Sequence, residues 1–164
     1  MKKLYLLRHA EAEKKAGQAD FERALTSFGE SQAEFLGKHM KENSIIPDLI
    51  LCSDAVRARQ TLNVLNKALR LPLKVLVYEH RLYNSSVEEL ENQISNANDS
   101  LNSLMLIAHN PAIATLPFRL QLSGEISGIN DFNSTCKFVA LQLELSSWSE
   151  LLTTKGSVES IVCP

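Results

Sequence analysis

The sequence is poor in cysteine and has few aromatic residues. Its three cysteines, Cys52, Cys136 and Cys163, do not have the spacing of a metal site. An odd number of thiols also favours a reduced protein over a disulfide framework. We therefore expect no metal ion held by cysteine, and we interpret the three residues as structural or incidental.

The chain also lacks an excess of positive charge and long hydrophobic runs. Its formal net charge is -2, which argues against the broad basic face that binds nucleic acid. The N-terminal apolar run has only four residues before Arg8, too few for a signal peptide core or a membrane span. We expect a soluble, cytoplasmic protein without a nucleic-acid or membrane partner, in which any anion site is local.

The pattern along the 164 residues predicts one domain, residues 1–164, with alternating strands and helices. Strands are expected at 2–7, 49–52, 73–78, 104–108 and 137–145. Helices are expected from a cap at Thr26 or Ser27 to Asn43, from a cap at Ser53 or Asp54 to about Leu71, and over 87–94 and 112–122. This alternation predicts a three-layer α/β/α sandwich with a mostly parallel central sheet.

Three finer expectations concern the C-terminal half. Pro117 predicts a kink in the last helix, and the Gly- and Ser-rich segment 123–133 predicts a loop. The second half of 137–145 alternates, which is typical of an edge strand. The remaining residues give a weak signal for one more strand or an ordered tail.

Basic side chains follow three of the expected strands. Arg8 and His9 come directly after the first strand, Arg57 follows the second, and His109 follows the strand at 104–108. Ligands of open α/β sheets bind outside the carboxyl ends of the strands, so these residues would meet there if the three strand ends are neighbours. Arg57 lies in the first turn of a helix, where a cation is unfavourable unless an anion shares the site.

Plainer interpretations of these residues remain open. Arg8 could pair with a local acid such as Glu11 or Glu13, and Arg57 could lie on a solvated helix face. His109 could be a hydrogen-bonded core histidine.

Four segments, taken in order, resemble the signature of the histidine phosphatase superfamily, also called the phosphoglycerate mutase-like family. They are Arg8-His9-Ala10, Leu25-Thr26 with Gly29, the stretch SDAVRARQT from Ser53 to Thr61, and Ile107 to Asn110. Each motif alone is weak, but the ordered set is specific and spans most of the chain. The short length, the Arg-His-Ala variant, Arg81-Leu82-Tyr83 and His109-Asn110-Pro111 look most similar to the SixA branch, the bacterial phosphohistidine phosphatases.

The resemblance implies a phosphoglycerate mutase-like fold and a phosphatase that uses no metal and no cofactor. His9 would be the nucleophile that is transiently phosphorylated, and Arg8, Arg57 and His109 would grip the phosphoryl oxygens. The implied partner is a phosphorylated protein, such as a histidine-containing phosphotransfer domain, or a small phosphorylated substrate. We also expect Arg23 near the pocket mouth, because it precedes the Leu-Thr-x-x-Gly element.

A general acid is the least certain part of the resemblance. Many family members use Glu or Asp to protonate an alkoxide leaving group, and Glu79 is the candidate here. The SixA branch departs from that pattern. An imidazole leaving group protonates near a pKa of ~6.5 and needs less help than an alkoxide.

Other functions are kept as alternatives. The first is hydrolysis of a small phosphate monoester, or a mutase reaction, although the chain is shorter than most mutases. The second is a non-catalytic phosphoprotein-binding module that retains the pocket.

Overall fold

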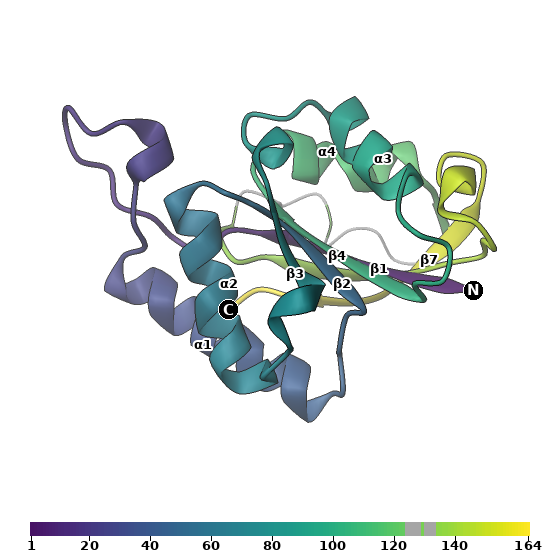
Figure 1. Cartoon of the computed structure of the whole chain (residues 1–164), viewed down its shortest axis with the longest axis horizontal. Helices are drawn as coiled ribbons and strands as arrows, with labels where there is room; N and C mark the ends of the chain where they lie inside the picture. Colours follow the sequence, from purple (N-terminus) through teal and green to yellow (C-terminus); the bar gives the residue numbers. More distant parts are fainter. Residues whose placement is uncertain (124–128, 130–133) are drawn as a thin grey trace.

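A computed structural model describes residues 1–123, 129 and 134–164 (Figure 1). The strands are β1 (Lys2–Arg8), β2 (Leu49–Ser53), β3 (Leu76–Glu79), β4 (Ser103–Ala108), β5 (Gln121–Ser123), β6 (Phe138–Leu143) and β7 (Lys155–Val162). The helices are α1 (Ser27–Glu42), α2 (Val56–Leu69), α3 (Val87–Ser95) and α4 (Ala112–Arg119). Short 3-10 helices include η1 (Asp20–Glu22) and η3 (His80–Leu82). The loop expected at 123–133 lies largely outside the described residues.

The strands form one sheet in the order β3-β2-β4-β1-β6-β7-β5. The pairs β3-β2, β2-β4, β4-β1 and β5-β7 are parallel, whereas β6 runs antiparallel to both β1 and β7. The expected mostly parallel sheet is therefore confirmed. In particular β2, β4 and β1 are adjacent, so the carboxyl ends of the three strands that carry basic residues meet at one edge.

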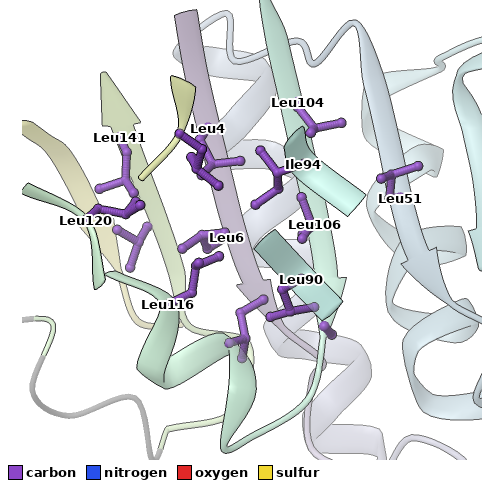
Figure 2. Close-up of a cluster of buried hydrophobic side chains, with 14 of the residues drawn as sticks. Leu4, Leu6, Leu51, Leu90, Ile94, Leu104, Leu106, Leu116, Leu120 and Leu141 are labelled. Carbon is purple, nitrogen blue, oxygen red and sulfur yellow. The ribbon is translucent and has the colours of Figure 1, made fainter. Parts of the chain in front are cut away.

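Helices cover both faces of the sheet, which confirms the three-layer architecture. One core contains Leu4 and Leu6 of β1 against Leu90 and Ile94 of α3, as Figure 2 shows. The opposite core contains Leu7 on the other face of β1, and side chains of α1 and α2 pack in the same core. Continuous apolar character in β1 thus reflects burial on both faces.

The bounds of α1 agree with the sequence expectation. Thr26 is the N-cap, and its hydroxyl oxygen accepts a hydrogen bond from the Gly29 backbone N–H at 3.0 Å; Asn43 is the C-cap. A Cβ atom at Gly29 would overlap the backbone carbonyl oxygen of Glu11. The glycine of the Leu-Thr-x-x-Gly element therefore lets α1 approach the segment that follows His9.

Two expectations about helix ends are wrong. Helix α2 begins after Ala55 with no side-chain cap, rather than after a cap at Ser53 or Asp54. The last helix ends at Arg119, not near 122, because Leu120 is extended and the next residues form β5 against β7. Pro117 lies inside this helix, close to its end.

The strand expected at 137–145 is present, but its expected place at the edge of the sheet is wrong. The strand is β6, and it lies between β1 and β7 because residues 155–162 form a further strand that pairs along its outer side. The weak C-terminal signal thus corresponds to β7. In the described part of the chain, no helix is both long and apolar enough to cross a membrane.

Candidate active site

The structure brings His9, Arg57 and His109 together at the carboxyl edge of the sheet. His9 follows β1 and His109 follows β4, and the rings of the two histidines lie 5.0 Å apart between centroids. Arg57 reaches them from the first turn of α2, and its Nε donates a hydrogen bond to His9 Nε2 at 3.2 Å. All three residues are buried.

His9 is held in one tautomer by its two hydrogen-bond partners. Its Nδ1 lies 2.8 Å from the backbone carbonyl oxygen of Ala10, which can only accept, so Nδ1 carries the proton. The Arg57 guanidinium can only donate, so Nε2 is unprotonated. Burial, together with the nearby His109 and arginine side chains, lowers the pKa of His9 to about 3. The ring is therefore neutral at physiological pH, and the electron pair of Nε2 accepts the hydrogen bond from Arg57.

His109 has a buried hydroxyl group as its neighbour. Its Nε2 lies 2.7 Å from the Ser53 hydroxyl oxygen at the end of β2. Burial and the positive charge of Arg57 lower the pKa of His109 to about 4. The second ring nitrogen, Nδ1, is buried and has no hydrogen-bond partner among the described residues.

Two further donors of Arg57 bind Asp20 in the 3-10 helix η1. Arg57 Nη1 donates to the Asp20 backbone oxygen at 2.6 Å, and Nη2 donates to the Asp20 carboxylate at 3.0 Å. The same carboxylate accepts hydrogen bonds from Arg23 at 2.9 Å and from the Tyr83 hydroxyl at 3.0 Å. Sequence reasoning missed Asp20, because one acid in a polar segment of mixed charge carries no signal of its own.

A cavity of about 730 Å³ opens beside His9. Arg8 and Arg23 both line it, as do Thr26 and Thr135. Burial and the charge of Arg57 lower the pKa of the Arg8 guanidinium. The lining as a whole combines three cations, Arg8, Lys14 and Arg23, with the carboxylates of Glu11 and Glu13, and this excess of positive charge suits an anionic ligand.

Glu79 is not among the residues that line this cavity. It is the last residue of β3, in register with Ser53 of β2, and its carboxylate accepts a hydrogen bond from the Arg81 backbone N–H at 3.2 Å. Of the other five predicted site residues, Arg8, His9 and Arg23 line the cavity, whereas Arg57 and His109, which also are not among its lining residues, contact His9.

Further residues of the 53–61 motif hold the backbone around the site. The Thr61 hydroxyl accepts a hydrogen bond from the Ala10 N–H at 3.0 Å and donates to the Arg57 carbonyl oxygen at 2.7 Å. The Gln60 side-chain oxygen accepts from the Leu25 N–H at 2.7 Å. The sequence motif at 53–61 already includes Gln60 and Thr61, whereas their hydrogen-bond partners depend on the tertiary structure.

No group of three or more His, Cys, Asp or Glu side chains is arranged to hold a metal ion within residues 1–123, 129 and 134–164. The charged and titratable groups that contact His9 or Arg57 or line the cavity include two histidines, three arginines and the Asp20 carboxylate. Such a set binds an oxyanion and offers one nucleophilic nitrogen.

Comparison with known families agrees with this geometry. The family model described as histidine phosphatase superfamily (branch 1) matches residues 4–117. The chain is also 31% identical over 110 residues to the protein Rv1276c of Mycobacterium tuberculosis. That alignment covers 67% of this chain and 66% of the mycobacterial protein, just under two thirds of its length.

Solved structures with the same fold include proteins that carry the name SixA. The one from Agrobacterium tumefaciens, named as a phosphohistidine phosphatase, is 26% identical, with a TM-score of 0.84 and coverage of 99% of this chain and 98% of that one. The protein histidine phosphatase SixA complexed with tungstate is 21% identical, with a TM-score of 0.81 over 99% and 97% of the two chains. At that identity the second likeness concerns the fold alone.

Proposed function

The chain belongs to the histidine phosphatase superfamily, and we propose that it is a phosphatase of protein phosphohistidine that works through a phosphorylated His9 and needs no metal or cofactor. The proposal treats residues 1–164 as one histidine phosphatase domain. Its setting would be signal transduction in a reducing cytoplasm, in line with cysteines that form no disulfide.

The tautomer of His9 is the observation that carries the proposal. A neutral imidazole attacks phosphorus only through an unprotonated nitrogen, and the Ala10 carbonyl oxygen fixes the proton on the other one. Nε2 is therefore the attacking atom. It faces the same cationic group, Arg57, that would bind the phosphoryl oxygens.

The reaction has two displacements at phosphorus. In the first, His9 Nε2 forms a bond to phosphorus while the bond from phosphorus to the substrate imidazole nitrogen breaks, and that imidazole takes up a proton from solvent. In the second, a water oxygen attacks phosphorus, the bond to His9 Nε2 breaks, and the water loses a proton as phosphate forms. Arg8, Arg57 and His109 stabilise the phosphoryl oxygens in both steps, since forked donors suit three equatorial oxygens.

Two observations favour a phosphohistidine substrate over an ester. The first is the likeness to the Agrobacterium tumefaciens SixA protein over nearly the full length of both chains. The second is that the Glu79 carboxylate accepts a hydrogen bond from the Arg81 N–H and is not among the residues that line the cavity, because an alkoxide leaving group needs an acid more than imidazole does. The substrate class we propose is a phosphorylated histidine-containing phosphotransfer domain.

The test compares wild type with His9→Ala on two substrates in the presence of a chelator. The substrates are a phosphorylated histidine-containing phosphotransfer domain and p-nitrophenyl phosphate. We expect wild type alone to release phosphate from the phosphoprotein, with slow ester cleavage, and His39→Ala, outside the site, to behave as wild type.

The other outcomes identify the alternatives. Fast ester turnover without action on the phosphoprotein would indicate a small-molecule phosphatase. Retention of phosphoprotein binding with no turnover in wild type would indicate a binding module. Activity that survives in His9→Ala would contradict the role of His9, and activity lost in chelator would contradict metal independence.

A further inference from the structure

Ser53 is a buried residue at the end of β2 that takes no part in the reaction steps described above. Its side chain is fully buried, and its hydroxyl oxygen lies 2.7 Å from His109 Nε2. The distance is typical of a strong hydrogen bond in which either atom can donate. Which atom donates decides where the proton of His109 resides.

A second contact of Ser53 indicates the direction of this bond. The backbone N–H of Ala55 donates to the Ser53 hydroxyl oxygen at 3.3 Å. A backbone N–H can only donate, so this contact takes one of the two lone pairs of the oxygen, and among the described residues the buried hydroxyl hydrogen then has His109 Nε2 as its acceptor. We infer that Ser53 donates to His109 Nε2, fixes the proton of the neutral ring on Nδ1, and is thus a positioning residue for the reaction.

The consequence concerns the other nitrogen of His109. Nδ1 is buried without a hydrogen-bond partner among the described residues, and the centroid of its ring lies 5.0 Å from that of the His9 ring. With the proton on Nδ1, this nitrogen is a donor ready for a phosphoryl oxygen. With the proton on Nε2, it would present an electron pair to that oxygen and repel it. Because the pKa of His109 is about 4, the ring is neutral at neutral pH and carries a single proton, which lies either on Nδ1 or on Nε2.

The functional half of this inference rests on the proposed function, whereas the tautomer does not. The tautomer can therefore be measured on the resting, full-length protein without any substrate. Two-bond ¹H–¹⁵N correlation spectra of the ¹⁵N-histidine-labelled protein at pH 7.5 distinguish protonated from unprotonated ring nitrogens, and His109→Gln assigns the signals. We expect His109 Nδ1 to be protonated and Nε2 unprotonated. The opposite pattern would overturn the inference.

Variants then test whether the hydroxyl group is the cause. In Ser53→Ala we expect His109 to populate both tautomers, and the affinity for inorganic phosphate to fall about tenfold. Ser53→Thr keeps a hydroxyl group and should restore the single tautomer. Ser103→Ala is the matched control, because this buried serine lies at the end of β4 opposite His109 and its hydroxyl group accepts from the Asp48 N–H at 2.9 Å. It should leave the His109 tautomer and the affinity for phosphate unchanged.

The outcomes separate this inference from the proposed function. Loss of phosphate affinity in Ser53→Ala with an unchanged His109 tautomer would mean a structural role for the serine and would contradict the inference. The expected tautomer in a protein that hydrolyses no phosphohistidine would leave the role of Ser53 intact while the proposed function fails. Should Ser53→Ala not fold, the wild-type spectrum alone decides the direction of the bond.

Discussion

The carboxylate of Asp20 lies on the guanidinium of Arg57, with 3.0 Å between its oxygen and Nη2. Arg57 Nη1 binds the backbone oxygen of the same residue, and Nε binds His9. In the resting protein, then, each nitrogen of Arg57 already has an acceptor. A phosphoryl group that enters the site therefore competes with the Asp20 carboxylate for the Arg57 guanidinium.

This relationship predicts that Asp20→Asn binds oxyanions more tightly than wild type. Partial burial opposes the charged form of Asp20, but hydrogen bonds from Arg23, Arg57 and Tyr83 prevail and hold its pKa well below the usual range. The carboxylate is therefore negative at neutral pH and competes with the ligand. Because the Asp20 carboxylate is half-exposed and screened by solvent, its pairing contributes up to about 1 kcal/mol, so we expect up to about fivefold tighter binding of inorganic phosphate or tungstate by calorimetry.

Glu22→Gln is the matched control for this prediction. It removes the same charge from the same 3-10 helix η1 without removing the Arg57 contact. We expect its affinity for phosphate to stay close to that of wild type. Weaker binding by Asp20→Asn would mean that Asp20 orders the arginines rather than competing with the ligand.

Thr61 supports His9 through the backbone of Ala10. Its hydroxyl oxygen accepts from the Ala10 N–H, and the Ala10 carbonyl oxygen in turn holds His9 Nδ1. In Thr61→Val we expect kcat to fall by roughly tenfold to a hundredfold and KM to stay nearly unchanged. The reason is that small errors in the position of a nucleophile slow the chemical step. Steady-state kinetics on the phosphoprotein measure both constants.

A threonine elsewhere in the fold provides the comparison. The Thr115 hydroxyl group donates to the Pro111 carbonyl oxygen four residues earlier in α4, as Thr61 does to Arg57 in α2. Thr115→Val should therefore leave kcat unchanged, and Thr61→Ser should recover most of it. Equal losses in Thr61→Val and Thr115→Val would point to general destabilisation.

The two buried histidines predict that the protein loses stability in mild acid. The pKa of His9 is about 3 and that of His109 about 4 in the folded state, against ~6.5 in an unfolded chain. Between these values the unfolded state binds more protons, so the free energy of unfolding falls as the pH falls below about 6.5. The slope is at most about 1.4 kcal/mol per pH unit for each histidine.

Denaturant unfolding from pH 7.5 to pH 4 checks this dependence. His109→Gln should have a shallower slope than wild type below pH 6.5, because one of the two titrating groups is gone. His39→Gln, a histidine of α1 outside the site, should keep the slope of wild type. A wild-type protein whose stability does not change between pH 6.5 and pH 4.5 would contradict the lowered pKa values.

The parts of the fold that the sequence predicted are those fixed by local signals. Helix α1 has its cap at Thr26 and its end at Asn43, where the helix-capping chemistry of these residues predicts them. Strand β1 is continuously apolar because both of its faces are covered. The basic residues at the ends of β1 and β4 meet because those strands are parallel neighbours.

Tertiary partners decided the points that sequence reasoning missed. Ser53 has the right chemistry for a helix cap, but its hydroxyl group lies against His109, 56 residues away in the sequence. Asp54 likewise pairs with His80 of η3 rather than capping α2. A local pattern states what such a side chain can do, whereas the choice among several partners depends on the packed structure. Asp20 is the extreme case, because its importance comes only from the folding of η1 onto Arg57.

Glu79 provides the sharpest test of the substrate class. Its carboxylate caps the Arg81 N–H at the start of η3 and does not line the cavity. Without an acid at the leaving group, an enzyme of this kind favours imidazole over an alkoxide. We therefore expect Glu79→Gln to turn over a phosphohistidine protein at a rate within about twofold of wild type. Glu88→Gln, which changes a carboxylate in the first turn of α3, is the control and should do the same. Loss of more than about a hundredfold on an alkyl phosphate monoester in Glu79→Gln alone would mean that Glu79 reaches the leaving group when substrate is bound, since general acid catalysis contributes about 10²- to 10⁴-fold. That result would favour a small phosphate ester as the substrate.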